Sequence, residues 1–212
     1  MLKKYEILNQ IHAGKVVAVI RGENEQEAYE IATACIRAGI QNIELTFTTP
    51  NVIDVIKKLS LDNKKQETVI GAGTVLDAET ARLAIISGAT YIVSPHFSKD
   101  ISSICNLYSI PYLPGCLSAT EMVEALKSGV DVVKVFPGGL MGPGYIKDIK
   151  GPLPTINLMP SGGVSLENVV DWLDNGSFAV GIGSVLTNGI TKGNYAEVEK
   201  RARLFVDKLA NY

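Results

Sequence analysis

Hydrophobic positions along the chain repeat one unit, an amphipathic helical stripe that ends at a glycine and is followed by a short apolar run. The stripe from Ala28 to Cys35, for example, stops at Gly39, and the run 43–46 follows it. The same succession recurs at three further glycines: Gly88, Gly129 and Gly176. A glycine just past a helix end is the usual left-handed cap. Strands that alternate with helices pair in parallel, and continuous apolar runs indicate strands covered on both faces.

The pattern predicts eight strands. They are Val16–Ile20, Asn42–Thr46, Thr68–Ala72, Thr90–Val93, Pro111–Leu113, Val132–Val135, Ile156–Met159 and Phe178–Ile182. An extra helix from about Lys3 to His12 precedes the first strand, and a final helix runs from about Tyr195 to Leu209. No linker, low-complexity segment or change of composition interrupts the chain, which predicts a single domain over residues 1–212.

Eight βα units in one domain favour an α/β fold of the TIM type, a (β/α)8 barrel with an extra N-terminal helix. The main competitor is an open doubly wound sheet, which usually carries a glycine-rich phosphate loop after its first strand. Here the first strand runs into Arg21-Gly22-Glu23, which is not such a loop. The barrel is therefore the predicted architecture.

Composition excludes several classes of partner. The 212 residues are 46% hydrophobic with a formal net charge of -2 and no cluster of Lys or Arg, which argues against nucleic acid and anionic membranes. No apolar run approaches the ~20 residues of a membrane span, and the N-terminus has no signal-peptide core. Three scattered cysteines indicate a reduced, cytoplasmic compartment. The two histidines have no ligand-type spacing, so no metal site is predicted, although carboxylates alone could hold magnesium.

A lysine, Lys134, stands in the middle of the predicted strand Val132–Val135. On an open sheet with a wet face it would be a solvated side chain. In a closed barrel it points inward with Val132 and Phe136, because side chains alternate along a strand. A desolvated lysine loses proton affinity and becomes a nucleophilic amine, as a Schiff base requires.

Glu44 is expected to face the same interior, since its neighbours Ile43 and Leu45 face the helices. An inward glutamate between apolar residues needs a partner or a proton. One interpretation is a buried ion pair with Lys134. The other is a general acid and base governed by that lysine. We favour the second, because both groups fall at the end of the barrel where active sites lie.

Other strand ends carry candidates of unequal weight. Arg21 ends the first strand, and its planar fork suits a carboxylate, although a surface arginine is an equal alternative. Thr74 follows Gly71-Ala72-Gly73, where glycines let a ligand approach and the hydroxyl can bind a substrate oxygen. The alternative for Thr74 is a helix cap. His96 is left outside the core set, and Cys116 is interpreted as packing because nothing adjacent would lower its pKa.

Two glycine pairs follow the last two strands, in Pro160-Ser161-Gly162-Gly163 and in Gly181-Ile182-Gly183-Ser184. Barrels commonly hold a phosphate between the loops after strands seven and eight. Either pair alone would be a plain turn, but both at these strands predict a phosphate site.

Together these residues resemble the class I aldolases of the KDPG/KHG family, which cleave 2-keto-3-deoxy-6-phosphogluconate and 4-hydroxy-2-oxoglutarate. The resemblance covers almost the whole chain. It is carried by five segments in order: Ile43-Glu44-Leu45-Thr46, Ile70-Gly71-Ala72-Gly73-Thr74-Val75, Val93-Ser94-Pro95, Lys134-Val135-Phe136-Pro137 and Pro160-Ser161-Gly162-Gly163-Val164.

The resemblance implies roles for individual residues. Lys134 matches the Schiff-base lysine, and Glu44 matches the glutamate that moves protons through a bound water. Thr74 matches the threonine that contacts the pyruvate carboxylate, while Pro95 and Phe136 match pocket-wall positions. The phosphate cradle is matched by Gly162, Gly163, Gly183 and Ser184. The resemblance also implies that the protein needs no cofactor, forms a homotrimer and acts in Entner–Doudoroff carbohydrate metabolism.

The chain departs from the family pattern at three positions. Many members carry an arginine four residues after the catalytic glutamate, where this chain has Thr48. Others place it at the end of the first strand, so the carboxylate is assigned to Arg21. Ser161 replaces the usual threonine before the double glycine and keeps the hydroxyl. His96 stands where glycine is common, at the pocket rim.

The resulting hypothesis is reversible retro-aldol cleavage through an imine on Lys134, with Glu44 as proton carrier. A phosphosugar isomerase or epimerase on the same barrel would share the phosphate cradle and use Glu44 as a base without covalent chemistry. A non-catalytic phosphosugar-binding barrel would lack the Lys134 and Glu44 pair. The preferred substrate stays open among the phosphogluconate-derived acid, the galactonate-derived acid and the unphosphorylated 4-hydroxy-2-oxoglutarate.

Overall fold

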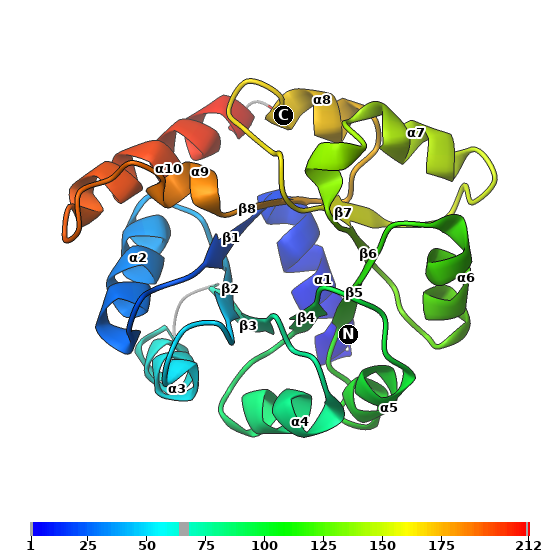
Figure 1. Cartoon of the computed structure of the whole chain (residues 1–212), viewed down its shortest axis with the longest axis horizontal. Coiled ribbons are helices and arrows are strands. Elements are labelled where there is room, and N and C mark those ends of the chain that lie inside the picture. The colour runs from blue at the N-terminus through cyan, green and yellow to red at the C-terminus, as the bar shows by residue number, and fades with distance from the viewer. Residues whose placement is uncertain (1, 64–67, 211) are drawn as a thin grey trace.

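Strands and helices alternate along the chain in the computed structural model, which describes residues 2–63, 68–210 and 212 (Figure 1). The strands are β1 Val16–Ile20, β2 Asn42–Thr46, β3 Val69–Gly73, β4 Ile92–Ser94, β5 Tyr112–Cys116, β6 Val133–Val135, β7 Leu158–Pro160 and β8 Val180–Ile182. The helices are α1 Lys3–Gly14, α2 Glu25–Arg37, α3 Val52–Asp62, α4 Ala78–Ile86, α5 Lys99–Leu107, α6 Ala119–Lys127, α7 Gly144–Lys150, α8 Val169–Asp174, α9 Ser184–Thr187 and α10 Tyr195–Leu209. A 3-10 turn, η1, spans Gly138–Leu140.

The strands form one parallel sheet in the order β7-β6-β5-β4-β3-β2-β1-β8. Its two ends meet, because Ser161 after β7 bridges Gly181 of β8 in parallel, and the Phe178 N–H donates to the Leu158 carbonyl at 2.8 Å. The sheet therefore closes into the predicted (β/α)8 barrel. The extra N-terminal helix is confirmed as α1.

Strand boundaries agree with the prediction at β1 and β2 and shift by one to three residues elsewhere. The largest difference is in β5, which continues past Pro114 to Cys116. Pairing explains the extension, since Gly115 and Cys116 lie opposite Lys134 and Val135 of β6. Because Pro114 has no N–H to donate, the sequence predicts that the strand ends before it. The pairing with β6 shows that the strand continues past this proline.

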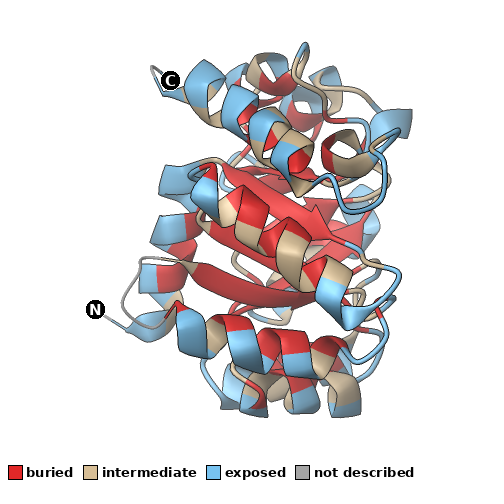
Figure 2. Ribbon diagram, turned by 90° about the vertical axis from the view of Figure 1, so that its left-hand side faces the viewer, coloured by how far each residue is buried: buried red, intermediate tan, exposed pale blue. Residues whose placement is uncertain are grey.

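Side chains alternate between two apolar layers, as the closed barrel requires. One layer lies between strands and helices and includes Ile43 and Val135. The other fills the barrel and includes Val132 and Met159. Figure 2 shows the buried residues as a continuous band through the strands and the inner faces of the helices.

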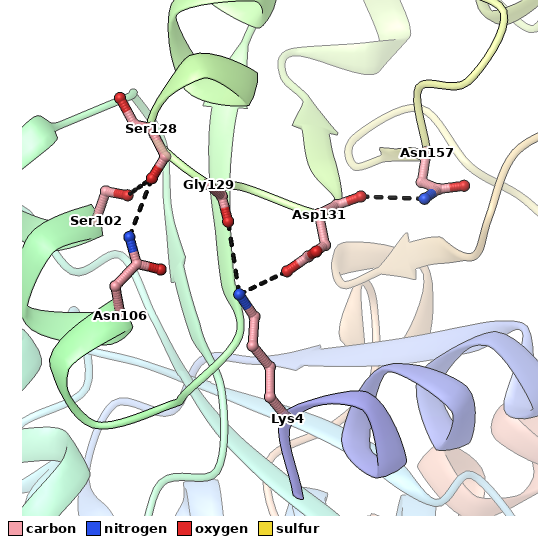
Figure 3. A network of polar contacts seen from close by, with 7 residues as sticks. All are labelled: Lys4, Ser102, Asn106, Ser128, Gly129, Asp131 and Asn157. Atoms are coloured by element: carbon pink, nitrogen blue, oxygen red, sulfur yellow. Dashed lines mark hydrogen bonds and ion pairs between the residues drawn. The ribbon is translucent and has the colours of Figure 1, made fainter. Parts of the chain in front are cut away.

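Helix α1 covers the N-terminal opening of the barrel, with Ile7, Leu8 and Ile11 in the inner apolar layer (Figure 1). Its position is held by Lys4, whose amine lies 2.6 Å from the carboxylate of Asp131 (Figure 3). Because α1 covers this end, the open mouth of the barrel is the one at the C-terminal ends of the strands, where active sites of such barrels lie.

Candidate active site

Lys134 and Glu44 meet inside the barrel. Both side chains are buried, and the Lys134 amine lies 3.9 Å from Oε1 of Glu44. The same amine stands 5.1 Å from the ring centroid of Phe136, in cation–π range. The inward directions predicted for both residues from strand periodicity are confirmed. An amine and a carboxylate are thus placed within reach of one small ligand.

Glycines on β3 make room for the carboxylate of Glu44. A Cβ at Gly73 would lie 1.9 Å from Glu44 Oε1, and a Cβ at Gly71 would lie 2.2 Å from Cζ of Tyr91. From the sequence alone, these glycines are expected to leave an opening for a ligand. That interpretation was wrong, because two protein side chains fill the space. Both carboxylate oxygens of Glu44 are buried and have no hydrogen-bond partner among the described residues.

Arg21 lies exposed at the C-terminal mouth of the barrel, on a segment held from both sides by threonines of the next βα turn. The Thr46 hydroxyl donates to the Ile20 carbonyl at 2.9 Å. The Gly22 N–H donates to the Thr49 hydroxyl at 3.0 Å. Arg21 therefore projects from an anchored backbone, and its fork is free of any ion pair with a described residue.

Thr74 follows β3 with a φ of 57°. A β-branched residue rarely adopts the left-handed region, which costs roughly 1–3 kcal/mol and occurs where the surroundings impose it, often at binding sites. Helix capping does not explain the strain, because the N-cap of α4 is Asp77, whose side chain accepts from the Thr80 N–H. The cap alternative for Thr74 is therefore wrong.

A hollow of about 80 Å³ opens at the C-terminal ends of β1, β6, β7 and β8. Six of the predicted site residues line it: Arg21, Phe136, Gly162, Gly163, Gly183 and Ser184. Phe136 joins the hollow to the interior, since its ring also faces the Lys134 amine. The structure thus brings the predicted carboxylate-binding, phosphate-binding and catalytic residues to one end of the barrel.

A further glycine pair, Gly138-Gly139 after β6, supports the pair Gly162-Gly163 and was not predicted from the sequence. The Gly138 N–H donates to the Ser161 carbonyl at 2.9 Å, and a Cβ at Gly163 would lie 2.4 Å from Cα of Gly139. The loop after β6 thus packs backbone to backbone on the loop after β7. Gly162 and Gly163 have positive φ angles of 86° and 76°, which favour glycine. The signal was Gly138-Gly139 directly after Phe136-Pro137.

Pro95 and His96 occupy different positions in the loop after β4. Pro95 is half-buried against β5, where a Cβ at Gly115 would lie 2.4 Å from its carbonyl carbon. Gly115 in turn pairs with Lys134. The His96 side chain is exposed, and the carbonyl of His96 accepts from the Tyr112 hydroxyl at 3.1 Å. Pro95 thus packs on β5, the strand next to the lysine strand, whereas His96 stays outside the core set.

The thiol of Cys116 is buried, and burial raises its pKa to about 12. Burial likewise raises the pKa values of Cys35 and Cys105 to about 12. A thiol that stays protonated at neutral pH is a poor nucleophile, so the interpretation of Cys116 as a packing residue agrees with the structure.

Within the described residues, no group of three or more His, Cys, Asp or Glu side chains is arranged to hold a metal ion. Nor does that part of the chain contain a helix long and apolar enough to cross a membrane.

Comparison with known proteins gives one consistent family. Residues 7–201 match the family model described as KDPG and KHG aldolase. The 2-dehydro-3-deoxy-phosphogluconate aldolase of Treponema pallidum is 31% identical over 201 residues, 93% of either chain. The 2-dehydro-3-deoxy-6-phosphogalactonate aldolase of Escherichia coli is 34% identical over 172 residues, 81% of this chain and 83% of that one.

A solved structure resembles the whole barrel. It is the KDPG aldolase of Legionella pneumophila with pyruvate captured as a covalent carbinolamine intermediate. The similarity has a TM-score of 0.82 at 26% identity and covers 93% of this chain and 96% of that one.

Proposed function

The chain belongs to the KDPG and KHG aldolase family, and on that basis we propose that it cleaves 2-keto-3-deoxy-6-phosphogluconate reversibly to pyruvate and glyceraldehyde 3-phosphate. The observation that carries the proposal is the buried pair of Lys134 and Glu44 at the site end of the barrel. The carbinolamine in the similar Legionella structure supports a covalent route through a lysine.

Lys134 is the proposed nucleophile. Its amine attacks C2 of the keto acid, and loss of water leaves a protonated imine. That cation accepts the electron pair of the C3–C4 bond as the bond breaks, so an aldehyde departs and the enamine of pyruvate remains. Protonation of the enamine at C3 and hydrolysis of the imine then release pyruvate and regenerate the amine.

Glu44 is the proposed proton carrier. It takes the proton of the C4 hydroxyl as the C3–C4 bond breaks, and it delivers a proton to C3 of the enamine. The 3.9 Å between the two side chains supports this role, because the amine and the carboxylate are close enough to contact the same substrate. The buried carboxylate oxygens, which have no hydrogen-bond partner among the described residues, are available to accept these protons.

Arg21 and Thr74 are proposed to hold the substrate carboxylate. Arg21 offers a planar pair of donors on an anchored backbone at the barrel mouth. The strained φ of Thr74 indicates that its backbone position is imposed for a purpose other than helix capping. Fixing the carboxylate orients C2 toward Lys134 before any bond changes.

The 6-phosphate is proposed to dock in the hollow beside Gly162, Gly163, Gly183 and Ser184. Glycine loops expose backbone N–H groups, and the hollow has no acidic lining residue to repel an anion. The similarity to a phosphogalactonate-type aldolase makes the galactonate-derived 6-phospho acid the alternative substrate. The family also suggests 4-hydroxy-2-oxoglutarate, cleaved to pyruvate and glyoxylate.

The test is to incubate the protein with pyruvate and sodium borohydride and to map the product by mass spectrometry. We expect one reduced adduct, on Lys134, and none in Lys134→Arg, which keeps the charge but forms no comparable imine. An unmodified lysine together with isomerase activity on a phosphosugar would contradict the aldolase proposal and support a phosphosugar isomerase or epimerase. Comparison of kcat/KM for the three candidate acids identifies the preferred substrate.

A homotrimeric assembly and a cytoplasmic location, with a role in the Entner–Doudoroff route, are further parts of the proposal. They rest on the family resemblance. Light scattering on the purified protein tests the trimer, and growth of a deletion strain on gluconate tests the pathway.

A further inference from the structure

The phenol of Tyr91 is an unexplained polar group inside the barrel. Tyr91 is fully buried in the inner apolar layer just ahead of β4. Its hydroxyl has no hydrogen-bond partner among the described residues. A buried hydroxyl without a partner is unfavourable, so its presence among apolar side chains calls for a specific role.

The hydroxyl end of Tyr91 lies beside Glu44. Tyr91 Cζ lies over Gly71 and Glu44 Oε1 lies over Gly73, within about 2 Å of the Cβ that each glycine lacks. Gly71 and Gly73 are two residues apart on β3, so their two Cβ positions are separated by about 6.6 Å. No direct hydrogen bond joins the two side chains. One water that bonds to two oxygens spans roughly 5.5 Å, which is of the same order as the spacing of the two glycine positions beneath these side chains.

The titratable groups that face Glu44 come from two directions. Lys134 approaches from β6 on the barrel axis, and Tyr91 lies ahead of β4. The inner positions Val19 on β1, Leu113 on β5 and Met159 on β7 are apolar, and Gly71, Gly73 and Gly115 carry no side chain. Arg21 stays at the rim. Burial, and then the charge of Glu44, raise the pKa of Tyr91 well above its ordinary value, so the phenol remains a donor.

We propose that Tyr91 is a positioning residue for Glu44, with its hydroxyl donating toward the carboxylate through a single bridging water. The inference rests on the proposed function of Glu44. A donor at this point favours the ionised carboxylate, which is the form that accepts the C4 proton. It also restricts rotation of the carboxylate, so that the other oxygen stays directed at the substrate bound to Lys134.

The experiment is Tyr91→Phe, which removes one oxygen and keeps the ring over Gly71. We expect kcat to fall by about tenfold with KM changed by less than about twofold, since the loss lies in proton transfer and not in binding.

Two readouts separate positioning from a general structural effect. Borohydride trapping of pyruvate on Lys134 should remain as in the wild type, whereas exchange of the pyruvate C3 protons with solvent deuterium should slow with kcat. The matched control is Tyr29→Phe, which removes a hydroxyl bonded to Asp62 on the outer surface and should change neither quantity. Unchanged kcat and exchange rate in Tyr91→Phe would overturn the proposal.

A variant-free check is a crystal structure of the wild-type protein at high resolution. A water within hydrogen-bonding distance of both the Tyr91 hydroxyl and a Glu44 oxygen supports the proposal, and a phenol bonded elsewhere overturns it. Failure of the proposed function looks different: pyruvate would not be trapped on Lys134 even in the wild type.

Discussion

The amine of Lys134 stands 3.9 Å from Oε1 of Glu44, with only 7% and 1% of the two side chains exposed. The residues come from β6 and β2, which lie on opposite sides of the ring of strands. Their meeting therefore spans the barrel interior. This separation is longer than a direct hydrogen bond, so neither group is tied to the other, and both can bond to a third molecule that contacts them.

The first prediction concerns the space that Gly73 leaves for Glu44. In Gly73→Ala the new methyl group would lie 1.9 Å from Glu44 Oε1 and 2.5 Å from Cδ, so the carboxylate must move. We expect kcat to fall by about tenfold or more, because misplacement of a proton carrier is costly. Gly144→Ala, with no atom within 4 Å of the added Cβ, is the control. Full activity in Gly73→Ala would show that Glu44 tolerates displacement.

The second prediction concerns recognition of the carboxylate by Arg21. Arg21→Lys keeps the positive charge but loses the planar fork, so the pyruvate concentration needed for half-maximal borohydride trapping should rise by about tenfold. Trapping at saturating pyruvate should still reach completion on Lys134. Arg37→Lys, which alters a surface ion pair with Glu199, should match the wild type. An unchanged concentration dependence in Arg21→Lys would show that a residue other than Arg21 binds the carboxylate.

The third prediction concerns the glycine loop after β7. Gly163→Ala places a methyl group at positive φ and 2.4 Å from Cα of Gly139, where only backbone can yield. KM for the 6-phospho acid should rise by about tenfold or more, with far less change for unphosphorylated 4-hydroxy-2-oxoglutarate. Gly193→Ala carries the same backbone strain with no atom within 4 Å of its Cβ, and it controls for strain alone. Equal losses on both substrates would argue against a phosphate role.

The fourth prediction is a loss of stability in alkali. Burial raises the pKa of the Cys35 thiol from 9.0 to about 12. Above pH 9 the unfolded chain can ionise this thiol while the folded chain cannot, so its contribution is present below pH 9 and is lost as the pH rises toward 12. The urea midpoint should fall over that window, less steeply in Cys35→Ala. Parallel slopes for the two proteins would contradict the assignment.

The fifth prediction tests how α1 is held at the closed end of the barrel. Lys4→Met keeps the apolar stem but removes the ion pair with Asp131 and the bond to the Gly129 carbonyl (Figure 3). The free energy of unfolding should fall by about 1 kcal/mol, since the lysine side chain is only 16% exposed. Lys57→Met, which breaks an exposed pair with Asp54, should have almost no effect. Denaturant titrations of both variants provide the comparison.

Local patterns were enough to predict much of the fold and of the site. Alternation along β2 and β6 assigned Glu44 and Lys134 to the interior because the two-residue period of a strand is independent of its partners. Glycines after helices predicted the order of elements, and the first two strands have the predicted bounds. Strand-end positions also predicted that Arg21 and Gly162 would lie at one mouth.

Local sequence patterns could not predict the contacts between segments that are distant in the chain. Gly71 and Gly73 looked like an open approach, yet side chains of Tyr91 and Glu44 fill the space, because neighbouring strands bring them over β3. The support of Gly163 by Gly139 likewise depends on two loops from different strands. Such contacts are set by register and barrel closure, which involve residues far apart in the chain.

The (β/α)8 order, the inward lysine and glutamate and the glycine loops could therefore be predicted from the sequence, since each follows from propensity, period or turn chemistry within a few residues. The 3.9 Å between Lys134 and Glu44 and the position of Tyr91 beside that glutamate depend on the three-dimensional fold. Those relationships arise because closure of the ring, by the bridge of Ser161 to Gly181, brings opposite strands across one packed interior.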